Sequence, residues 1–233
     1  MDGSFRFKKF EVSHSRSALK VGTDAVVLGA AMTLTPKDSR LLDIGTGCGV
    51  IALMAAQRLD HPANICCIDI DGPSIEEAAQ NFAASPWAEN LEAVCVPLAE
   101  YSPEGPLDVI FSNPPFFENS LKNPDPRETT ARHTGSLSYR DICAFAAQNL
   151  SAEGRLSLIL PFEAYGALVR TAASFGLHPF RMVSIRTTPL KEPKRLLAEF
   201  SRTRGPVAEE SLVLQDGTAH STQYAALTED FYL

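Results

Sequence analysis

The chain has 233 residues, 45% of them hydrophobic, and a formal net charge of −7. This length can bury a sizeable core as one α/β domain with additions. The acidic balance argues against non-specific nucleic-acid binding, which depends on Lys and Arg neutralising phosphates. The chain has no apolar stretch of 18 residues, and its first ten residues alternate aromatic with polar side chains. A signal peptide has an apolar core instead, so we expect a cytoplasmic protein.

The five cysteines, at positions 48, 66, 67, 95 and 143, form no CxxC pair. An odd number of cysteines with this spacing argues against a disulfide framework and against a zinc site. We therefore expect buried thiols and no metal.

Apolar segments alternate with segments of helical spacing through most of the chain. Strands are predicted at residues 40–44, 64–70, 91–96, 107–112 and 155–160. Helices are predicted at residues 25–32, 50–59, 73–82, 139–150 and 163–175, with a turn at Glu153-Gly154 before the last strand. This alternation predicts a parallel sheet covered on both faces by right-handed crossovers.

The end of the chain departs from the alternation. Segments 180–187, 196–203 and 211–214 are β-rich without intervening helices, so we expect them to pair antiparallel at one edge of the sheet. The predicted fold is a single α/β, Rossmann-like domain. It has an N-terminal cap segment (1–39), a cofactor-binding core (40–175), and antiparallel edge strands with a tail (176–233).

A glycine-rich turn, Asp43-Ile44-Gly45-Thr46-Gly47-Cys48-Gly49, follows the first predicted strand of the sheet. Such a turn lets the backbone approach a ligand closely at the carboxyl end of the strand. The spacing is G-x-G-x-G, and the Asp43 carboxylate would repel a pyrophosphate. It can instead hold the cationic methionine end of S-adenosylmethionine. The turn therefore favours S-adenosylmethionine over a nicotinamide dinucleotide.

Three further segments are candidate cofactor contacts. Asp69 closes the second strand and can accept both ribose hydroxyls, whereas Asp71 favours the start of the next helix beside Pro73. Ala99 and Glu100, after the third strand, are expected to meet the adenine. Residues upstream of the first helix are expected to cover the methionine end, namely Lys20, Thr23 and Asp24.

The fourth strand is followed by Asn113-Pro114-Pro115-Phe116, a motif that can position an amino group for attack. A planar amino nitrogen attacks poorly, because its lone pair is delocalised. If the Asn113 side-chain oxygen and the Pro114 carbonyl each accept one N–H, the lone pair is aimed at the sulfonium methyl. Prolines stiffen the turn, and Phe116 can stack on the base. The motif thus predicts an N-methyltransferase that works by positioning and electrostatics.

The chain resembles the bacterial valine-tRNA adenine-N6 methyltransferases, within the class I amino-methyltransferases. The resemblance is carried by residues 20–30 (KVGTDAVVLGA), 42–49 (LDIGTGCG), 113–117 (NPPFF), 131–133 (ARH) and 230–233 (DFYL). It implies a class I methyltransferase fold and methylation of the adenosine just 3′ of the anticodon. It also implies that Asp43, Gly45 and Asp69 contact the cofactor, and that Arg132 and His133 lie on the RNA side of the pocket.

Two segments are basic despite the acidic total. Residues 1–20 contain five basic and two acidic residues, and residues 186–204 contain six basic and two acidic residues. Local basic patches of this kind suit a structured polyanion. We therefore expect one positive tRNA-binding face around Asn113, with Lys8, Lys9, Lys194 and Arg195 next to the loop of Arg132 and His133.

Other functions share parts of this pattern. The substrates of protein-glutamine N5 methyltransferases and of ribosomal-RNA guanine-N2 methyltransferases present the same planar NH₂ to an Asn-Pro-Pro turn. The glutamine-modifying enzymes usually carry an N-terminal helical domain, and only about 39 residues precede the first strand here. A DNA adenine methyltransferase is disfavoured, because we find no recognition domain in the sequence. From another class, a non-catalytic S-adenosylmethionine-binding RNA module would not need Asn113 and Phe116.

Overall fold

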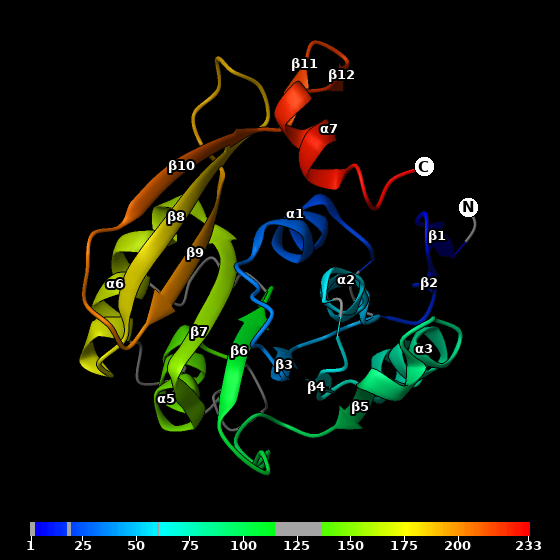
Figure 1. Cartoon of the computed structure of the whole chain (residues 1–233). Helices are drawn as coiled ribbons and strands as arrows, with labels where there is room; N and C mark the ends of the chain where they lie inside the picture. The colour runs from blue at the N-terminus through cyan, green and yellow to red at the C-terminus, as the bar shows by residue number, and fades with distance from the viewer. Residues whose placement is uncertain (1–2, 18–19, 60, 115–136) are drawn as a thin grey trace, which may run out of the picture.

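The computed structural model describes residues 3–17, 20–59, 61–114 and 137–233. Its centre is an eight-stranded sheet of order β10-β8-β9-β7-β6-β3-β4-β5 (Figure 1). The strands are β3 (Arg40–Ile44), β4 (Asn64–Asp69), β5 (Leu91–Cys95), β6 (Leu107–Ser112), β7 (Leu150–Pro161), β8 (His178–Arg186), β9 (Arg195–Ser201) and β10 (Ala208–Val213). Strands β3 to β7 pair in parallel, as predicted. The edge where they end is called the carboxyl edge below, and the opposite edge the amino edge.

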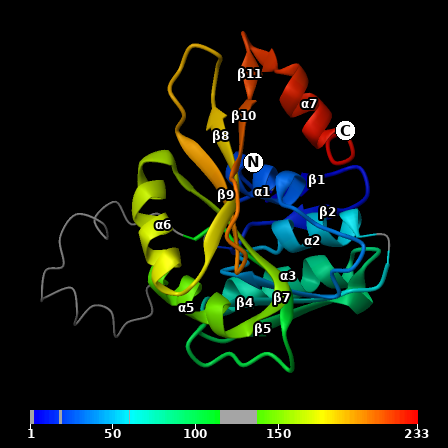
Figure 2. The same cartoon turned by 60° about the vertical axis from the view of Figure 1, so that its left-hand side comes forward.

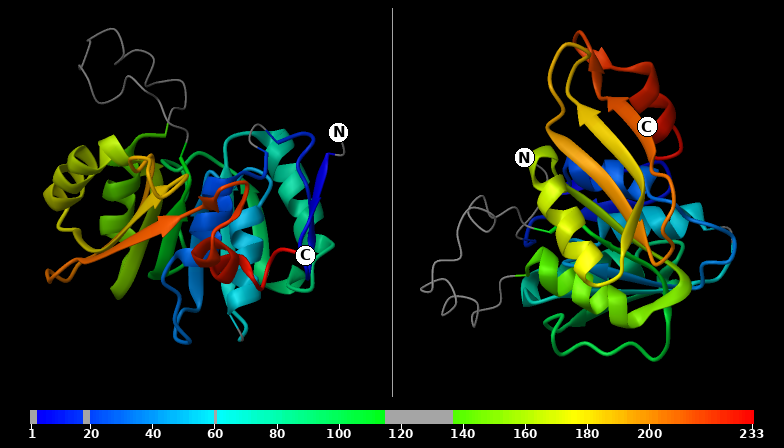
Figure 3. Two further views of the ribbon diagram at one scale, coloured as in Figure 1. Left: turned by 90° about the horizontal axis from the view of Figure 1, so that it is seen from above. Right: turned by 90° about the vertical axis from the view of Figure 1, so that its left-hand side faces the viewer.

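Helices cover both faces of the sheet (Figures 1 and 3). One face carries α1 (Thr23–Ala31), α2 (Val50–Arg58) and α3 (Gly72–Ala83), and the other carries α5 (Tyr139–Asn149) and α6 (Tyr165–Ser174). Short 3₁₀ turns, η1 (Ala88–Asn90) and η3 (Phe162–Ala164), precede β5 and α6. Because strand side chains alternate, Leu41 and Val109 pack into the core on the α1–α3 face, while Leu42 and Ile110 pack into the core on the α5–α6 face. The predicted layered α/β architecture is confirmed.

The C-terminal strands confirm one expectation and correct another. Strand β9 is antiparallel to both β7 and β8, as predicted. Strand β10 was expected to be antiparallel as well, but it pairs parallel with β8. Both sides of β9 are already occupied, so β10 can only join the free side of β8. The chain leaves β9 at the amino edge, so β10 starts there and runs in the direction of β8.

The predicted turn at Glu153-Gly154 is also wrong, because both residues lie within β7. The pairing of β6 with β7 passes from Leu107 opposite Leu150 to Val109 opposite Arg155, with a shift of register between the two pairs. The extra residues of β7 are therefore taken up as a local irregularity, and no turn breaks the strand.

The two ends of the chain form elements that the sequence did not predict. They are the hairpin β1 (Ser4–Arg6) and β2 (Glu11–Ser13), the hairpin β11 (Gln215–Asp216) and β12 (Ala219–His220), and helix α7 (Thr222–Thr228). The Phe7 ring stacks on Phe10 and on Tyr232, at centroid distances of 4.5 and 6.1 Å. The Lys8 N–H donates to the Phe231 carbonyl at 2.8 Å. The N-terminal hairpin and the C-terminal tail are thus held together (Figure 1).

In the part of the chain that the structure describes, no helix has the length and apolar character needed to cross a membrane.

Candidate cofactor and acceptor site

The glycine turn connects β3 to α2 in a conformation that requires glycine. The φ angles of Gly45, Gly47 and Gly49 are 72°, 55° and 82°, in the left-handed region that side chains disfavour. The amides of Gly45 and Thr46 both donate to the Ile68 carbonyl, at 2.8 and 3.1 Å. A Cβ on Gly49 would lie 2.3 Å from the Phe82 ring. The turn therefore packs closely against β4 and α3.

Asp43 is fully buried just before this turn. Its Oδ2 accepts a hydrogen bond from the Thr46 hydroxyl at 2.7 Å, while its Oδ1 has no hydrogen-bond partner among the described residues. Burial raises the pKa of Asp43 to about 7; the Thr46 bond opposes this, and the Asp69 charge adds to it. A buried carboxylate oxygen left without a partner suits a cationic ligand. The residues present thus fit the ammonium group of S-adenosylmethionine.

We expect the affinity for S-adenosylmethionine to rise as pH increases through about 7, with proton release on binding. The cationic ligand favours the carboxylate, so binding lowers the pKa that burial had raised. In the free protein, the raised pKa means that the folded state holds more protons than the unfolded state between about pH 4 and pH 7. Unfolding free energy should therefore fall as pH rises across that window. Calorimetry in buffers of different ionisation enthalpy measures the proton release.

The variant that removes this titration is Asp43→Asn, which should abolish the proton release and remove the Asp43 contribution to the pH dependence of stability. Asp216→Asn is a matched control, because Asp216 is exposed on β11. Proton release that persists in Asp43→Asn would assign the titration to another group.

Asp69 and Asp71 have different local tasks. Asp69 accepts from the Gly47 amide through Oδ2 and from the Asp71 amide through Oδ1, each at 3.0 Å. Asp71 caps α3, because its Oδ2 accepts from the Ser74 amide at 3.0 Å and from the Ser74 hydroxyl at 2.6 Å. A carboxylate has about four lone-pair sites, so Asp69 keeps acceptor capacity at the carboxyl edge. Asp69 stays our candidate for the ribose.

Asp69→Ala is expected to weaken S-adenosylmethionine and S-adenosylhomocysteine equally, by roughly 1.5–3 kcal/mol, because both contain the same ribose. Asp71→Ala is expected instead to lower the unfolding free energy by about 1 kcal/mol through loss of the cap. Titration calorimetry and thermal unfolding of the two variants distinguish these effects. A larger loss of cofactor affinity in Asp71→Ala would reverse the assignment.

The residues expected to meet the adenine follow β5. Ala99 and Glu100 are exposed and lie in a turn in which the Glu100 amide donates to the Pro97 carbonyl at 2.9 Å. That amide is therefore used within the turn. Ile70, which the sequence analysis counted only as the end of a strand, directly follows β4 and is 56% exposed. It offers an apolar surface beside Asp69.

Asn113 is partly buried immediately after β6, and Pro114 is buried. The buried Ser112 hydroxyl donates to the Ile44 carbonyl at 2.6 Å. This bond fixes the end of β6 against the end of β3, so Asn113 and Gly45 lie at neighbouring strand ends. Leu137 lies near the same place, with its Cδ2 4.0 Å from where a Cβ on Gly45 would stand.

Part of the predicted acceptor site lies outside the described residues: Pro115, Phe116, Arg132 and His133.

Two side chains of α3 that the sequence analysis missed attach the N-terminal segment to the glycine turn. The Glu77 carboxylate accepts from the amides of Ser15, Arg16 and Ser17 at 2.8, 3.1 and 2.7 Å. Burial alone would raise its pKa, but these hydrogen bonds outweigh burial and lower it. The Asn81 amide donates to the carbonyls of Ser13 and Cys48, at 2.8 and 2.9 Å.

The signal for Glu77 and Asn81 was present in the sequence. They stand four residues apart on the helix face that also buries Ala78 and Phe82. An acid and an amide on such a face need partners.

Asp24 and Arg195 were predicted to contact the cofactor and the RNA, respectively. In the structure the Arg195 Nε donates to the Asp24 Oδ2 at 2.7 Å. The pair joins the first turn of α1 to the start of β9, and it partly neutralises the Arg195 charge. Lys20 and Thr23 are exposed before and at the start of α1.

The topology separates Arg202 and Arg204 from the positive face expected around Asn113. Lys194 lies at the carboxyl edge, before β9. Arg202 and Arg204 follow β9 at the amino edge, where Arg202 donates to the Ala147 and Leu150 carbonyls. Lys8 and Lys9 lie in the β1–β2 turn, where the Lys8 Nζ donates to the Glu229 carbonyl at 2.6 Å. The basic charges of the two segments therefore divide between different parts of the surface.

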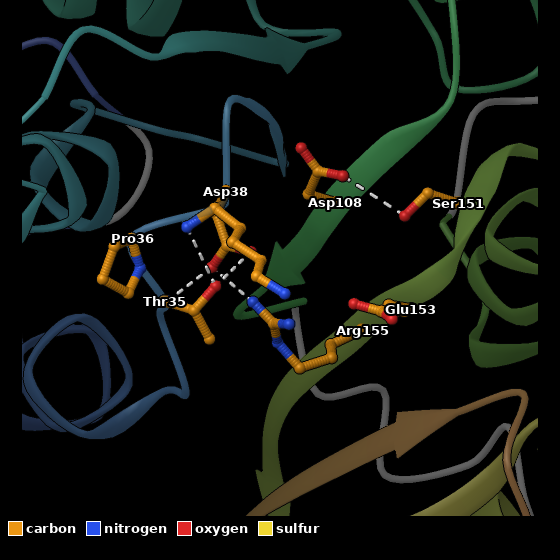
Figure 4. A pocket seen from close by; sticks show the side chains of 8 residues that line it. Thr35, Pro36, Asp38, Asp108, Ser151, Glu153 and Arg155 are labelled. Carbon is orange, nitrogen blue, oxygen red and sulfur yellow. Dashed lines mark hydrogen bonds and ion pairs between the residues drawn. The ribbon is translucent and has the colours of Figure 1, made fainter.

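A polar pocket lies at the amino edge of the sheet (Figure 4), whereas Asn113 lies at the carboxyl edge. Asp38 pairs with Arg155 inside it. Asp108 accepts from the Ser151 hydroxyl at 3.2 Å, and from the Ser39 and Arg40 amides. These groups hold the starts of β3, β6 and β7 together, which is a structural role.

Within the described ranges, no group of three His, Cys, Asp or Glu residues could hold a metal ion.

The fold and the glycine turn define a class I methyltransferase, and comparison with known proteins agrees. Residues 6–161 match the model of the methyltransferase small domain family. A predicted O-methyltransferase from Agrobacterium tumefaciens superposes with a TM-score of 0.69 at 17% identity, covering 89% of this chain and 96% of that one. A methyltransferase from Pyrococcus furiosus superposes with a TM-score of 0.61 at 18% identity, covering 83% and 90%.

Several relatives match over nearly the whole chain. The Parabacteroides distasonis protein is 42% identical and the Bacteroides fragilis protein 40% identical, each covering 98% of this chain and 97% of the relative. The Photobacterium profundum protein is 37% identical, covering 100% and 99%. All three are named tRNA1(Val) (adenine(37)-N6)-methyltransferase. The chain belongs to the family of these bacterial tRNA methyltransferases.

Proposed function

We propose that the protein transfers a methyl group from S-adenosylmethionine to N6 of an adenosine in tRNA, at the position next to the anticodon of a valine tRNA. The observation that carries this proposal is the placement of Asn113, at the strand end beside the glycine turn, where Asp43 has an unpartnered carboxylate oxygen. The names of relatives that span the whole chain support the choice of acceptor. A tRNA substrate also places the enzyme in the cytoplasm.

Each part of the cofactor has a candidate partner. Asp43 would hold the ammonium group, the backbone of Gly45 and Gly47 would allow close approach, and Asp69 would accept the ribose hydroxyls. Ile70 would cover the adenine with its exposed apolar side chain. The bound cofactor supplies an electrophilic methyl group on its sulfonium.

The chemistry required of the protein is positioning. The Asn113 side-chain oxygen and the Pro114 carbonyl would accept the two N–H groups of the adenosine amine, which turns the nitrogen lone pair toward the methyl group. Pro114 fixes the backbone at this point, because its ring restricts φ. Phe116 would stack on the flipped base. No strong general base is needed, because the amine proton becomes acidic only after methylation.

Methyl transfer from labelled S-adenosylmethionine to separate pools of tRNA, ribosomal RNA, DNA and protein tests the proposal. We expect label in tRNA, recovered as N6-methyladenosine after digestion to nucleosides. Label recovered as N2-methylguanosine or on protein glutamine would replace the proposal with one of the alternative acceptors. Cofactor binding without transfer to any of the four pools would indicate a non-catalytic module.

A further inference from the structure

Three exposed large apolar side chains lie beyond the carboxyl ends of sheet strands. The large apolar residues exposed in the described part of the chain are Ile70 (56% exposed), Phe162 (36%), Leu190 (98%) and Leu233 (82%). Leu233 is the last residue of the chain. Ile70 and Phe162 directly follow β4 and β7, and Leu190 follows β8 by four residues. Single exposed apolar residues are ordinary, but three of them beyond the strand ends that also carry Asn113 indicate a ligand surface.

The strand order divides these residues between two sides of the site. Strand β4 lies beyond β3, on the side of Asp69, so Ile70 belongs to the cofactor half. Strands β7, β9 and β8 lie in that order beyond β6, so Phe162 and Leu190 belong to the acceptor half. Neighbouring strands are about 4.8 Å apart. The sideways spacing is therefore roughly 5 Å from β6 to β7 and roughly 14 Å from β6 to β8. Strand β7 also continues for three residues past Leu158, which pairs with Ser112 at the end of β6, and this adds roughly 10 Å along the strand.

The loop that carries Leu190, residues 187–194, is held by backbone hydrogen bonds. The Lys191 amide donates to the Thr188 carbonyl at 3.1 Å, which closes a turn beneath Leu190. The Lys194 amide donates to the Ile185 carbonyl at 3.0 Å, and the Phe162 amide donates to the Lys194 carbonyl at 3.1 Å. Phe162 and the base of the loop thus form one braced unit, from which the loop projects beside β11 (Figure 2).

Cations surround this apolar unit. Lys191 and Lys194 are exposed on the loop, with one acid, Glu192, between them. Arg186 ends β8 at the base of the loop, and its buried Nε has no hydrogen-bond partner in the described part of the chain. Single-stranded nucleic acids bind where aromatic side chains stack on bases and neighbouring cations receive phosphates. Phe162 supplies the aromatic ring, the 187–194 loop supplies the cations, and Leu190 adds an exposed apolar surface.

We propose that Phe162 and Leu190 form a platform for the unpaired RNA bases next to the flipped-out adenosine, with Lys191 and Lys194 holding the adjoining phosphates. The inference rests on the proposed function, since it requires an RNA acceptor at Asn113. Base stacking holds the loop of the RNA while the target base turns into the Asn113 pocket.

The test compares Leu190→Ala and Phe162→Ala with the control Leu233→Ala. Leu233 is also an exposed leucine, but it is the last residue of the sequence and is not part of the proposed platform. Because Leu190 is 98% exposed, its truncation should leave the unfolding temperature and the S-adenosylmethionine affinity unchanged. We expect kcat/KM on a valine tRNA transcript to fall roughly tenfold in Phe162→Ala, by a smaller factor in Leu190→Ala, and not in the control. Leu190→Trp, which keeps a larger stacking face, should retain or improve kcat/KM.

A second measurement follows the stacking of the neighbouring bases directly. With 2-aminopurine beside the target adenosine, wild-type protein should change its fluorescence on binding, and Leu190→Ala should reduce that change. A wild-type enzyme that methylates tRNA while Leu190→Ala and Phe162→Ala keep full kcat/KM would overturn the platform and leave the proposed function standing. A wild-type protein that methylates no RNA would overturn both.

Discussion

Asn113→Ala is expected to lower the rate of methyl transfer by about 10²–10³-fold while the affinity for S-adenosylmethionine stays near that of the wild type. By analogy with the loss of one positioned oxyanion-hole donor, this corresponds to about 2.7–4 kcal/mol. The proposed contact is to the acceptor amine, which bears its new charge only as the methyl group transfers. The loss should therefore fall on the transition state and leave the bound cofactor unaffected.

Single-turnover kinetics measure the chemical step, and calorimetry measures cofactor binding. Asn149→Ala is a suitable control, because Asn149 ends α5 and its amide donates to the Phe145 carbonyl within the same helix. Asn149→Ala should transfer methyl groups at the wild-type rate. If Asn113→Ala instead lost cofactor affinity as much as rate, Asn113 would belong to the cofactor site.

Glu77→Ala is expected to lower the unfolding free energy by about 3 kcal/mol and to weaken cofactor binding as well. The Glu77 side chain is 1% exposed, and its removal leaves the amides of residues 15–17 without their acceptor. Hydrogen bonds to a charged group contribute roughly 1.5–3 kcal/mol each, although they do not add fully. Residues 15–17 belong to the N-terminal cap segment and pack next to Gly47, because a Cβ built on Gly47 would lie 3.3 Å from the Ser17 hydroxyl. Cofactor affinity should therefore fall when this segment loses its attachment to Glu77.

The adjacent residue provides the control. Glu76 is 71% exposed and pairs with Arg16 at 3.3 Å, and an exposed pair of this kind contributes about 0–1 kcal/mol. Glu76→Ala should therefore change stability little. Because the pKa of Glu77 is lowered in the fold, its contribution is present above the ordinary glutamate pKa and is lost as pH falls through the lowered value. Denaturant unfolding at pH 7 and in acid should show the difference between wild type and Glu77→Ala shrinking with acidification.

The parts of the site that the sequence predicted are those that depend on local chain geometry. The strand, glycine turn and helix around Gly45 form within about 20 residues, and positive φ angles favour glycine wherever the turn occurs. Asn113 could be placed at the acceptor site because a strand stopped by prolines must end there. Parallel strands then bring these two ends to the same edge of the sheet.

The parts that the sequence did not predict depend on contacts between distant segments. Asp24 and Arg195 are 171 positions apart, and each taken alone suggested a different ligand contact. The direction of β10 depended on which side of β8 remained free, and this is a property of the whole sheet. The hydrogen bond from the Lys8 Nζ to the Glu229 carbonyl joins residues 221 positions apart, so charge alone did not predict it.

We expect the protein to methylate one adenosine amine in valine tRNA. The most direct test uses two transcripts of valine tRNA that differ only at the nucleotide 3′ of the anticodon, with adenosine in one and guanosine in the other. We predict label from S-adenosylmethionine in the adenosine transcript, recovered as N6-methyladenosine, and none in the guanosine transcript. Equal labelling of both transcripts would rule out the adenosine next to the anticodon as the target, because the enzyme would then methylate another position of the RNA.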